Sequence, residues 1–320
     1  MRLKKWLKEN VFYIYDWKKE IKKERKYEIS NEKEAYLKKW YYHKTGLKLD
    51  LNNPKTFTDK QQYLKIYGVT PIKTYCTDKY LVRNFVKNTI GDKYLIPNIK
   101  INGKDFFKNA NEISYDDLPN SFVIQCNHGA HMTHIVKNKK KLSRFQYYLL
   151  QKKINKELKI NYAYCHGYEM HYRDIEPCIF VTKYLSDGQD LPDYKFFYFN
   201  GKLEYFSVDS NRFKNHKRTI YDNSLRIAPF QCEKYDPIDF KLNQSDVIKM
   251  IKISNELASY FDFVRVDLYC INGNIYFGEL TFSSASGIAL LTPNDSNKKM
   301  SSYIDLNKIG VSQNNPYEKI

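Results

Sequence analysis

The chain has 320 residues, a formal net charge of +17 and six cysteines. No apolar run approaches the length of a membrane span, the N-terminus has no signal-peptide apolar region, and no two cysteines have C-x-x-C spacing, which argues against membrane-spanning, secreted and disulfide-scaffold classes. The positive charge favours an anionic partner such as a nucleotide, an acidic glycan or a lipid surface, although abundant Lys, Asn, Ile and Tyr are equally consistent with compositional drift.

Residues 1–30 combine aromatic and aliphatic residues with many lysines and arginines. On a basic helix, six of them would form an apolar stripe: Trp6, Leu7, Val11, Phe12, Ile14 and Tyr15. Such a helix can lie on an anionic membrane surface. The alternative is an ordinary helix that packs on its own domain and leaves a solvated basic face. We expect a cytoplasmic protein, and contact of residues 1–30 with the inner face of the membrane stays an open alternative.

Predicted helices and strands alternate through the rest of the chain. Helices are expected over 31–49, 77–90, 142–158 and 245–260, with Thr58 as the N-cap of a further helix after Pro54. Strands are expected over 95–97, 122–126, 135–137 and 179–185. Asn200-Gly201 and Asn272-Gly273 predict tight turns, which join 194–199 to 203–208 and 263–269 to 275–282 as β-hairpins. This mixture indicates an α+β fold.

The second hairpin carries one carboxylate on each strand. Asp267 and Glu279 are 12 residues apart, and strand alternation allows both to face the same side. Two converging carboxylates repel each other and are costly to bury without a partner. A divalent cation removes that cost, and Mg²⁺ prefers one or two carboxylates plus substrate phosphates. The carboxylates therefore predict a magnesium–nucleotide enzyme. In the alternative interpretation, they form a salt bridge with Arg265 or a surface lysine instead of binding a metal.

Five further motifs accompany this hairpin: Asn53-Pro54-Lys55-Thr56-Phe57, Gly91-Asp92-Lys93-Tyr94-Leu95-Ile96-Pro97, Phe122-Val123-Ile124-Gln125-Cys126-Asn127-His128-Gly129, Leu191-Pro192-Asp193-Tyr194-Lys195-Phe196-Phe197 and Asn215-His216-Lys217-Arg218-Thr219-Ile220-Tyr221-Asp222. Together they resemble the TupA-like (teichuronopeptide biosynthesis) group of the ATP-grasp superfamily over about residues 53–293. The resemblance implies two α+β lobes with Mg·ATP between them. A basic helical extension would occupy 1–50, the N-terminal and first ATP-grasp lobe 51–180, and the second lobe with the metal hairpin 181–320.

The resemblance also implies site residues on the metal side. Asp267 and Glu279 would bind one or two Mg²⁺ ions, with Thr281 as a weaker ligand where related D-alanine–D-alanine ligases have Asn. Arg265 resembles the arginine that binds the transferred phosphate, and pairing with Asp267 is its alternative. The loop at 283–287 would receive the acceptor, or is an ordinary loop.

The nucleotide side departs from the family at Gln125, where lysine is usual. The change implies weaker ATP binding, compensation by a basic residue such as Lys137, or loss of activity. His128 and Gly129 would open the loop over the phosphates, and the spacing of the histidines argues against zinc there. The backbone of Lys183-Tyr184-Leu185 would pair with adenine.

Asp193 would bind ribose or metal, and Lys195 would meet phosphate or pair with Asp193. A polar cluster near residue 216 would bind the acidic acceptor or the phosphates: Asp209, Arg212, His216, Lys217 and Arg218. His216 is either a general base for the amine or a structural histidine.

These residues imply an ATP-dependent amide ligase that acts through an acyl phosphate. It would join an amine or amino acid to a uronic-acid-containing surface polysaccharide or its precursor. A glycosyltransferase of the same biosynthesis and a non-catalytic nucleotide- or glycan-binding relative are the alternatives, and no motif of a nucleic-acid-binding module appears.

Overall fold

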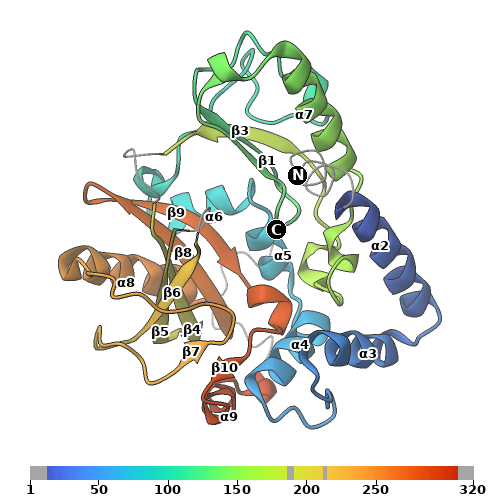
Figure 1. Ribbon diagram of the computed structural model, residues 1–320, viewed down its shortest axis with the longest axis vertical. Coiled ribbons are helices and arrows are strands. Elements are labelled where there is room, and N and C mark those ends of the chain that lie inside the picture. The colour runs from blue at the N-terminus through green and yellow to red at the C-terminus, as the bar shows by residue number, and fades with distance from the viewer. Residues whose placement is uncertain (1–12, 186–190, 212–214, 309–320) are drawn as a thin grey trace. The chain divides into compact units, whose positions relative to one another are not determined.

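The computed structural model describes residues 13–185, 191–211 and 215–308, with side chains between residues 16 and 307 of these ranges. Two compact units are discontinuous in sequence (Figure 1). Unit 1 comprises residues up to 36, 78–81 and 96–185, and unit 2 comprises 37–77, 82–95 and the residues from 186 onward. The boundaries expected at 50 and 180 differ from this division, because unit 2 begins within α3 (Lys33–Thr45) and residues 78–81 return to unit 1.

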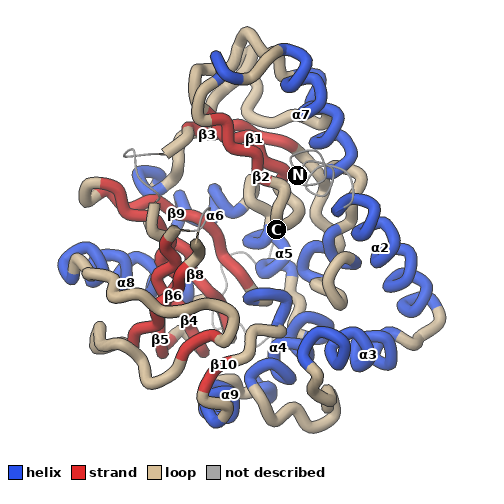
Figure 2. Tube along the Cα trace, viewed as in Figure 1, coloured by secondary structure: helices blue, strands red, loops and turns tan. Residues whose placement is uncertain are grey.

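Unit 1 is built on an antiparallel sheet with the strand order β2-β1-β3 (Figure 2). Alternate residues of β1 and β3 enter one apolar core, which includes Phe122, Ile124 and Val181. The expected strands over 122–126, 135–137 and 179–185 are thus confirmed, with shifted ends. The elements are β1 (Phe122–Cys126), β2 (Thr133–Val136), β3 (Ile179–Lys183), α2 (Tyr13–Ile29), α7 (Arg144–Glu157) and 3₁₀ turns at Ala110–Glu112, Lys139–Lys141, Tyr162–Tyr164 and Met170–Tyr172.

Helix α2 packs on unit 1 through Trp17, whose ring lies edge-on to Tyr162 at 5.8 Å between centroids. Of the expected apolar stripe, residues 6–12 and the side chains of 14 and 15 lie outside the described part of the chain. Across the described residues, no helix is both long and apolar enough to cross a bilayer.

Unit 2 contains a five-stranded antiparallel sheet with the order β6-β5-β4-β8-β9. One face packs on α8, which lies across β4, β5 and β8 (Figure 1). The strands are β4 (Asp193–Phe199), β5 (Lys202–Ser210), β6 (Lys217–Asp222), β8 (Phe263–Ile271) and β9 (Asn274–Thr281), with β7 (Gln231–Cys232) and β10 (Leu291–Thr292) paired separately. The helices are α4 (Phe57–Tyr67), α5 (Pro71–Thr77), α6 (Val82–Thr89), α8 (Gln244–Ala258) and α9 (Asp295–Ser302), with 3₁₀ turns at Asp92–Tyr94, Ser284–Gly287 and Leu306–Lys308.

Both predicted hairpins are confirmed. The φ angles are +49° and +74° at Asn200 and Gly201, and +50° and +77° at Asn272 and Gly273. Two successive positive φ angles match the twist of the flanking strands, and Asn-Gly supplies them at low cost. These turns set the register that brings the polar side chains together.

Three local predictions are wrong. The helix expected over 77–90 does not form as one element. The Asp78 carboxylate accepts hydrogen bonds from the backbone N–H groups of Tyr80 and Leu81, and the resulting turn separates α5 from α6. Thr56 rather than Thr58 caps α4, through a capping box with Asp59. Residues 95–97 form no strand, and Pro97 has no N–H to donate to a ladder.

Candidate active site

The face of the unit 2 sheet opposite α8 carries a polar cluster beside an apolar one that includes Phe197, Tyr205 and Ile220. The register places Lys195 of β4 directly beside Asp267 of β8. Directly opposed residues share a face, so their side chains lie on the side away from Phe196 and Val266, which enter the core with α8. By the same alternation, this face gathers residues from all five strands: Asp193, Lys195, Ser207, Asp209, Arg218, Arg265, Asp267, Glu279 and Thr281.

Asp267 and Glu279 are paired across β8 and β9 and share one partner. Nη2 of Arg265 lies 2.7 Å from Oδ2 of Asp267 and 3.0 Å from Oε1 of Glu279. A bulge follows Asp267, and a Cβ at Gly278 would come within 3.0 Å of the Asp267 carbonyl oxygen, so this close approach favours glycine. The hairpin therefore converges two carboxylates on one nitrogen.

The guanidinium of Arg265 is held on every side. Nε lies 2.6 Å from Oδ1 of Asp267, Nη1 lies 2.9 Å from the Ser284 hydroxyl, and Nη2 lies 3.0 Å from the Thr281 hydroxyl. Burial alone would lower the pKa of Arg265, but the carboxylates of Asp267, Glu279 and Asp193 raise this pKa above its usual range. Arg265 is therefore a fixed positive charge at the centre of the face.

Lys195 lies between two carboxylates. Its Nζ is 2.6 Å from Oδ2 of Asp193 and 2.5 Å from Oδ2 of Asp267, and the whole residue is 4% exposed. Asp267 thus lies between two cations, Lys195 and Arg265. Both pairings foreseen as alternatives are present together: Lys195 with Asp193, and Arg265 with Asp267.

A second ion pair lies at the β5–β6 end of the face. Arg218 binds the buried Asp209 through two bonds, Nε to Oδ1 at 2.5 Å and Nη2 to Oδ2 at 2.7 Å. Nε2 of His216 is 3.1 Å from Oδ2 of Asp209, and its ring lies 4.2 Å from that of Tyr235. Burial would raise the pKa of Asp209, but Arg218, Lys195 and His216 lower this pKa to about 2. Arg212 of the predicted cluster lies outside the described residues.

The depressed pKa of Asp209 predicts an acid-labile contribution to stability. Because the folded-state pKa lies below the ordinary value of about 3.9, the contribution is present above about pH 4 and is lost as pH falls toward 2. We expect it to amount to about 2 kcal/mol of the unfolding free energy. Urea unfolding of the wild type and of Asp209→Asn across this range measures it. Parallel pH profiles for the two proteins would contradict the assignment.

The carboxylates of the hairpin fit a magnesium ion by their chemistry. Across residues 13–185, 191–211 and 215–308, no cluster of three or more His, Cys, Asp or Glu side chains has an arrangement suited to a metal. Magnesium does not require one, since one or two carboxylates suffice when phosphates and waters complete its shell. Asp267 and Glu279 supply two hard oxygen donor groups, and the side chain of Glu279 is 39% exposed and accessible from solvent.

The loop after β9 has an unusual backbone. Ala285, Ser286 and Gly287 have φ angles of +48°, +54° and +72°, which are costly for the first two residues. Two buried side chains of α4 hold the loop: Gln62 donates to the carbonyls of Ser286 (3.0 Å) and Gly287 (2.8 Å), and Lys65 donates to that of Ser286 (2.9 Å). Neither contact was predicted from the sequence, because nothing local links α4 to a loop more than 200 residues later.

Replacing Gln62 with leucine is expected to loosen this loop. Two carbonyl oxygens lose a buried donor, so the free energy of unfolding should fall by about 1–3 kcal/mol. Gln61→Leu is the matched control, since no hydrogen-bond partner is found for its buried amide among the described residues, and the change should cost much less. Chemical denaturation of both variants measures the difference. Equal losses would show that Gln62 does not support the loop.

In unit 1, Gln125 lies on β1 between Thr133 of β2 and Phe180 of β3. The adjoining His128 is buried, with Nδ1 3.3 Å from the Asn127 side-chain oxygen and Nε2 3.3 Å from the Glu157 carbonyl. Burial lowers the pKa of His128 to about 4, so the ring is neutral near pH 7. At Gly129, an added Cβ would come within 2.9 Å of Met132. The turn after β1 is therefore tightly packed.

The expected adenine segment begins at Lys183, the last residue of β3. The backbone N–H of Lys183 donates to the Pro97 carbonyl at 3.0 Å, while the Lys183 side chain is exposed. Tyr184 and Leu185 are half-buried. Nζ of Lys137 lies 5.8 Å from the centre of the Tyr184 ring, which is a cation–π distance. This places the predicted compensating lysine beside the predicted adenine segment.

Lys79 is a candidate that was not predicted from the sequence, because Thr77-Asp78 suggested a helix cap. Its ammonium donates to the carbonyl of Gly129, and its backbone N–H donates to the carbonyl of Asn127 at 3.1 Å. Asp78 fixes this arrangement by accepting from the Asn127 side chain at 2.7 Å. A positive charge from a distant segment therefore lies at the turn after β1, the strand that carries Gln125.

A cavity of about 30 Å³ lies on the same face of the unit 2 sheet, where the polar and apolar clusters meet. It is lined by residues of the sheet, of α4 and of the loop after β9: Phe57, Thr58, Phe197, Tyr205, Ser207, Arg218, Ile220, Cys232, Ser284, Gly287, Ala289 and Leu291. The buried hydroxyl of Ser207 finds no hydrogen-bond partner among the described residues. Ser207 was not among the predicted site residues, because a serine within an aromatic strand carries no local signal.

Comparisons with known proteins identify the family. No curated protein matches the sequence. Among solved structures, D-alanine–D-alanine ligase from Bacillus anthracis complexed with ATP is 14% identical, over 78% of this chain and 72% of that one, with a TM-score of 0.40. The ATP-grasp ligase PsnB with its minimal precursor is 9% identical, over 72% and 61%, with a TM-score of 0.37. A model of the TupA-like ATP-grasp family matches residues 59–305, most of the chain. This protein therefore belongs to the TupA-like ATP-grasp family.

Proposed function

We propose that this protein is an ATP-dependent carboxylate–amine ligase. The observation that carries the proposal is the convergence of Asp267 and Glu279 on Arg265, beside the buried Lys195, in a chain of the ATP-grasp family. Alternating carboxylates and cations on one sheet face suit a magnesium–triphosphate, because the carboxylates match the metal and the cations match the phosphate oxygens. Membership of the ATP-grasp family supports ATP as the nucleotide.

In the proposed reaction, an oxygen of the substrate carboxylate attacks the γ-phosphorus of ATP, and the bond to the bridging oxygen breaks to release ADP. The amine then attacks the carbonyl carbon of the acyl phosphate, inorganic phosphate leaves, and the nitrogen loses its proton. Arg265 and Lys195 would bind phosphoryl oxygens and stabilise the charge that develops on them. Asp267 and Glu279, with Thr281 beside them, would hold one or two Mg²⁺ ions, which neutralise phosphate charge when bound.

The acceptor would bind near the loop at 283–287 and the β5–β6 pair. His216 would take the proton from the amine, and the Asp209 carboxylate favours the protonated ring that results. Arg218 keeps Asp209 ionised, so that this carboxylate does not compete for the proton. In unit 1, Lys79 would supply the positive charge that Gln125 lacks, which favours an active enzyme over a non-catalytic relative.

The substrates are inferred from the family resemblance and from charge. We propose a uronic-acid-containing surface polysaccharide, or its precursor, as the carboxylate and an amino acid or other amine as the acceptor, in the cytoplasm. The formal net charge of +17 supports an acidic substrate.

ADP release in a coupled assay tests this function. We expect release that requires Mg²⁺, a uronic-acid oligosaccharide and an amine together, with an amide product detectable by mass spectrometry. ADP formation at the same rate without one of the two organic substrates would contradict a ligase. A melting temperature raised by UDP-sugars but not by ATP would favour a glycosyltransferase.

A further inference from the structure

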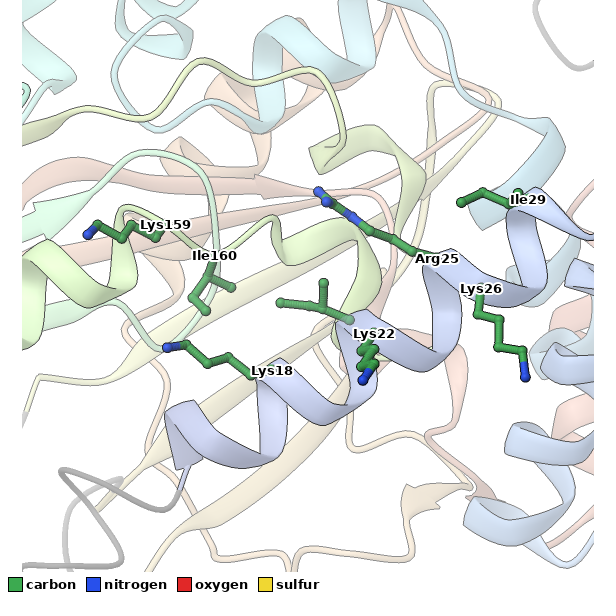
Figure 3. A pocket seen from close by; sticks show the side chains of 8 residues that line it. Lys18, Lys22, Arg25, Lys26, Ile29, Lys159 and Ile160 are labelled. Carbon is green, nitrogen blue, oxygen red and sulfur yellow. The ribbon is translucent and has the colours of Figure 1, made fainter.

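A groove of about 560 Å³ runs along α2 in unit 1 (Figure 3). Figure 3 shows basic side chains projecting from α2, with the Lys159–Ile160 segment beside the helix. Five of the eight lining residues are basic, three are isoleucines and none is acidic: Lys18, Ile21, Lys22, Arg25, Lys26, Ile29, Lys159 and Ile160. All five basic residues are exposed. The groove therefore combines a positive wall with apolar patches.

Helix α2 sorts its charges between two sides. Its acidic residues recur at every fourth position, at 16, 20, 24 and 28, and residues four apart share a helix face. Glu24 on this stripe is fully buried and accepts the backbone N–H groups of Gly167 at 2.8 Å and Tyr168 at 3.0 Å. The acidic side of α2 therefore packs against unit 1, where Glu24 is bound. The basic residues line the groove, and no carboxylate is found among the described residues of that lining.

The groove suits an extended polyanion better than a bilayer. Lys18, Lys22 and Lys26 succeed one another about 6 Å apart along the axis, a regular row that matches a chain with repeating negative charges. The apolar residues that could anchor α2 in lipid are partly used elsewhere: Trp17 is 6% exposed within the core of unit 1, and Ile21 is half-buried against it. An interfacial helix needs a free apolar face, which this packing removes.

We propose that this groove binds a segment of a linear polymer that carries a carboxylate on each repeating unit. The row of ammonium groups pairs with the carboxylates, while the half-buried Ile21 and the exposed Ile29 contact the less polar faces of the sugar rings. The inference rests on the proposed function, because such a polymer is the acidic substrate of the ligase. The groove would then hold the polymer at a point separate from the reacting carboxylate and favour long chains over single sugars.

Binding of a fluorescently labelled oligogalacturonate to the full chain tests the proposal. Lys18→Gln/Lys22→Gln/Lys26→Gln should bind about tenfold more weakly than wild type, because three exposed ion pairs are lost. Lys140→Gln/Lys141→Gln/Lys156→Gln is the matched control, since it removes the same charge from exposed positions outside the groove. Glutamine preserves helix propensity, and circular dichroism checks folding. Binding should weaken with salt and be absent for neutral dextran.

Three outcomes would overturn the proposal: equal affinity of the two triple variants for the oligomer, equal affinity for free galacturonate and the oligomer, or groove-dependent binding to phosphatidylglycerol vesicles without binding to the oligomer. The thermal shift with Mg·ATP should be unchanged in the groove variant. Loss of oligomer binding with an intact ATP shift would assign the groove. Oligomer binding in a protein that gives no ATP shift would instead count against the ligase function alone.

Discussion

Glu279→Gln is expected to reduce ADP formation by about a hundredfold or more while leaving the protein folded. The side chain of Glu279 is 39% exposed, so loss of its charge should cost little stability, whereas the magnesium–phosphate site would lose one of its two anionic ligands. Asp267→Asn should also reduce turnover by at least as much. In addition, it should destabilise the fold, because Lys195 and Arg265 both lose a buried carboxylate partner. Steady-state ADP release with thermal melting separates the two effects.

Glu256→Gln is the matched control, because Glu256 is an exposed glutamate of α8 in the same unit. It should retain wild-type turnover. If Glu279→Gln and Asp267→Asn both turned over ATP at the wild-type rate, the assignment of these carboxylates to the metal would be wrong.

Replacement of Arg265 should give the second largest effect. Arg265→Lys keeps the charge but loses the fork that contacts Asp267 twice, together with Glu279, Thr281 and Ser284. We expect a drop in kcat of about a hundredfold, because a point charge reproduces only part of this arrangement around the phosphoryl group. Arg265→Met should also destabilise the protein by about 3 kcal/mol, since the buried Asp267 carboxylate loses one of its two cationic partners.

A double-mutant cycle distinguishes structure from catalysis. Arg265→Met/Asp267→Asn removes both members of the ion pair and should recover part of the stability lost in Arg265→Met, without recovering turnover. Urea unfolding and ADP release on the four proteins measure both quantities. Wild-type kcat in Arg265→Lys, or turnover that recovers together with stability in the double variant, would show that Arg265 acts only as a structural partner.

The hairpins were predictable because their signals are local. Asn-Gly demands two positive φ angles, and strand alternation then places Asp267 and Glu279 on one face. Helix α8 was predicted from its apolar spacing, and its cap at Asn243 was found only in the structure. The motifs of the family, spread over most of the chain, predicted the ATP-grasp fold that the family match confirms.

The partners within the site were not predictable in the same way. Lys195 meets Asp267 only because β4 pairs with β8, across 72 residues of sequence. Lys79 reaches the turn after β1 because Asp78 stops a helix that periodicity favoured, and Gln62 reaches the loop at 283–287 through packing of α4. Such contacts arise from tertiary packing, and no local pattern in the sequence indicates them.

A crystal structure of the protein with Mg²⁺ and ADP is the decisive test of the metal site on the β8–β9 hairpin. We expect a metal ion bound by carboxylate oxygens of Asp267 and Glu279, with phosphate oxygens on the same metal and within hydrogen-bonding distance of Arg265 or Lys195. A nucleotide whose metal and phosphates are held by other residues, with Asp267 and Glu279 still bound only to side chains of the protein, would contradict this assignment.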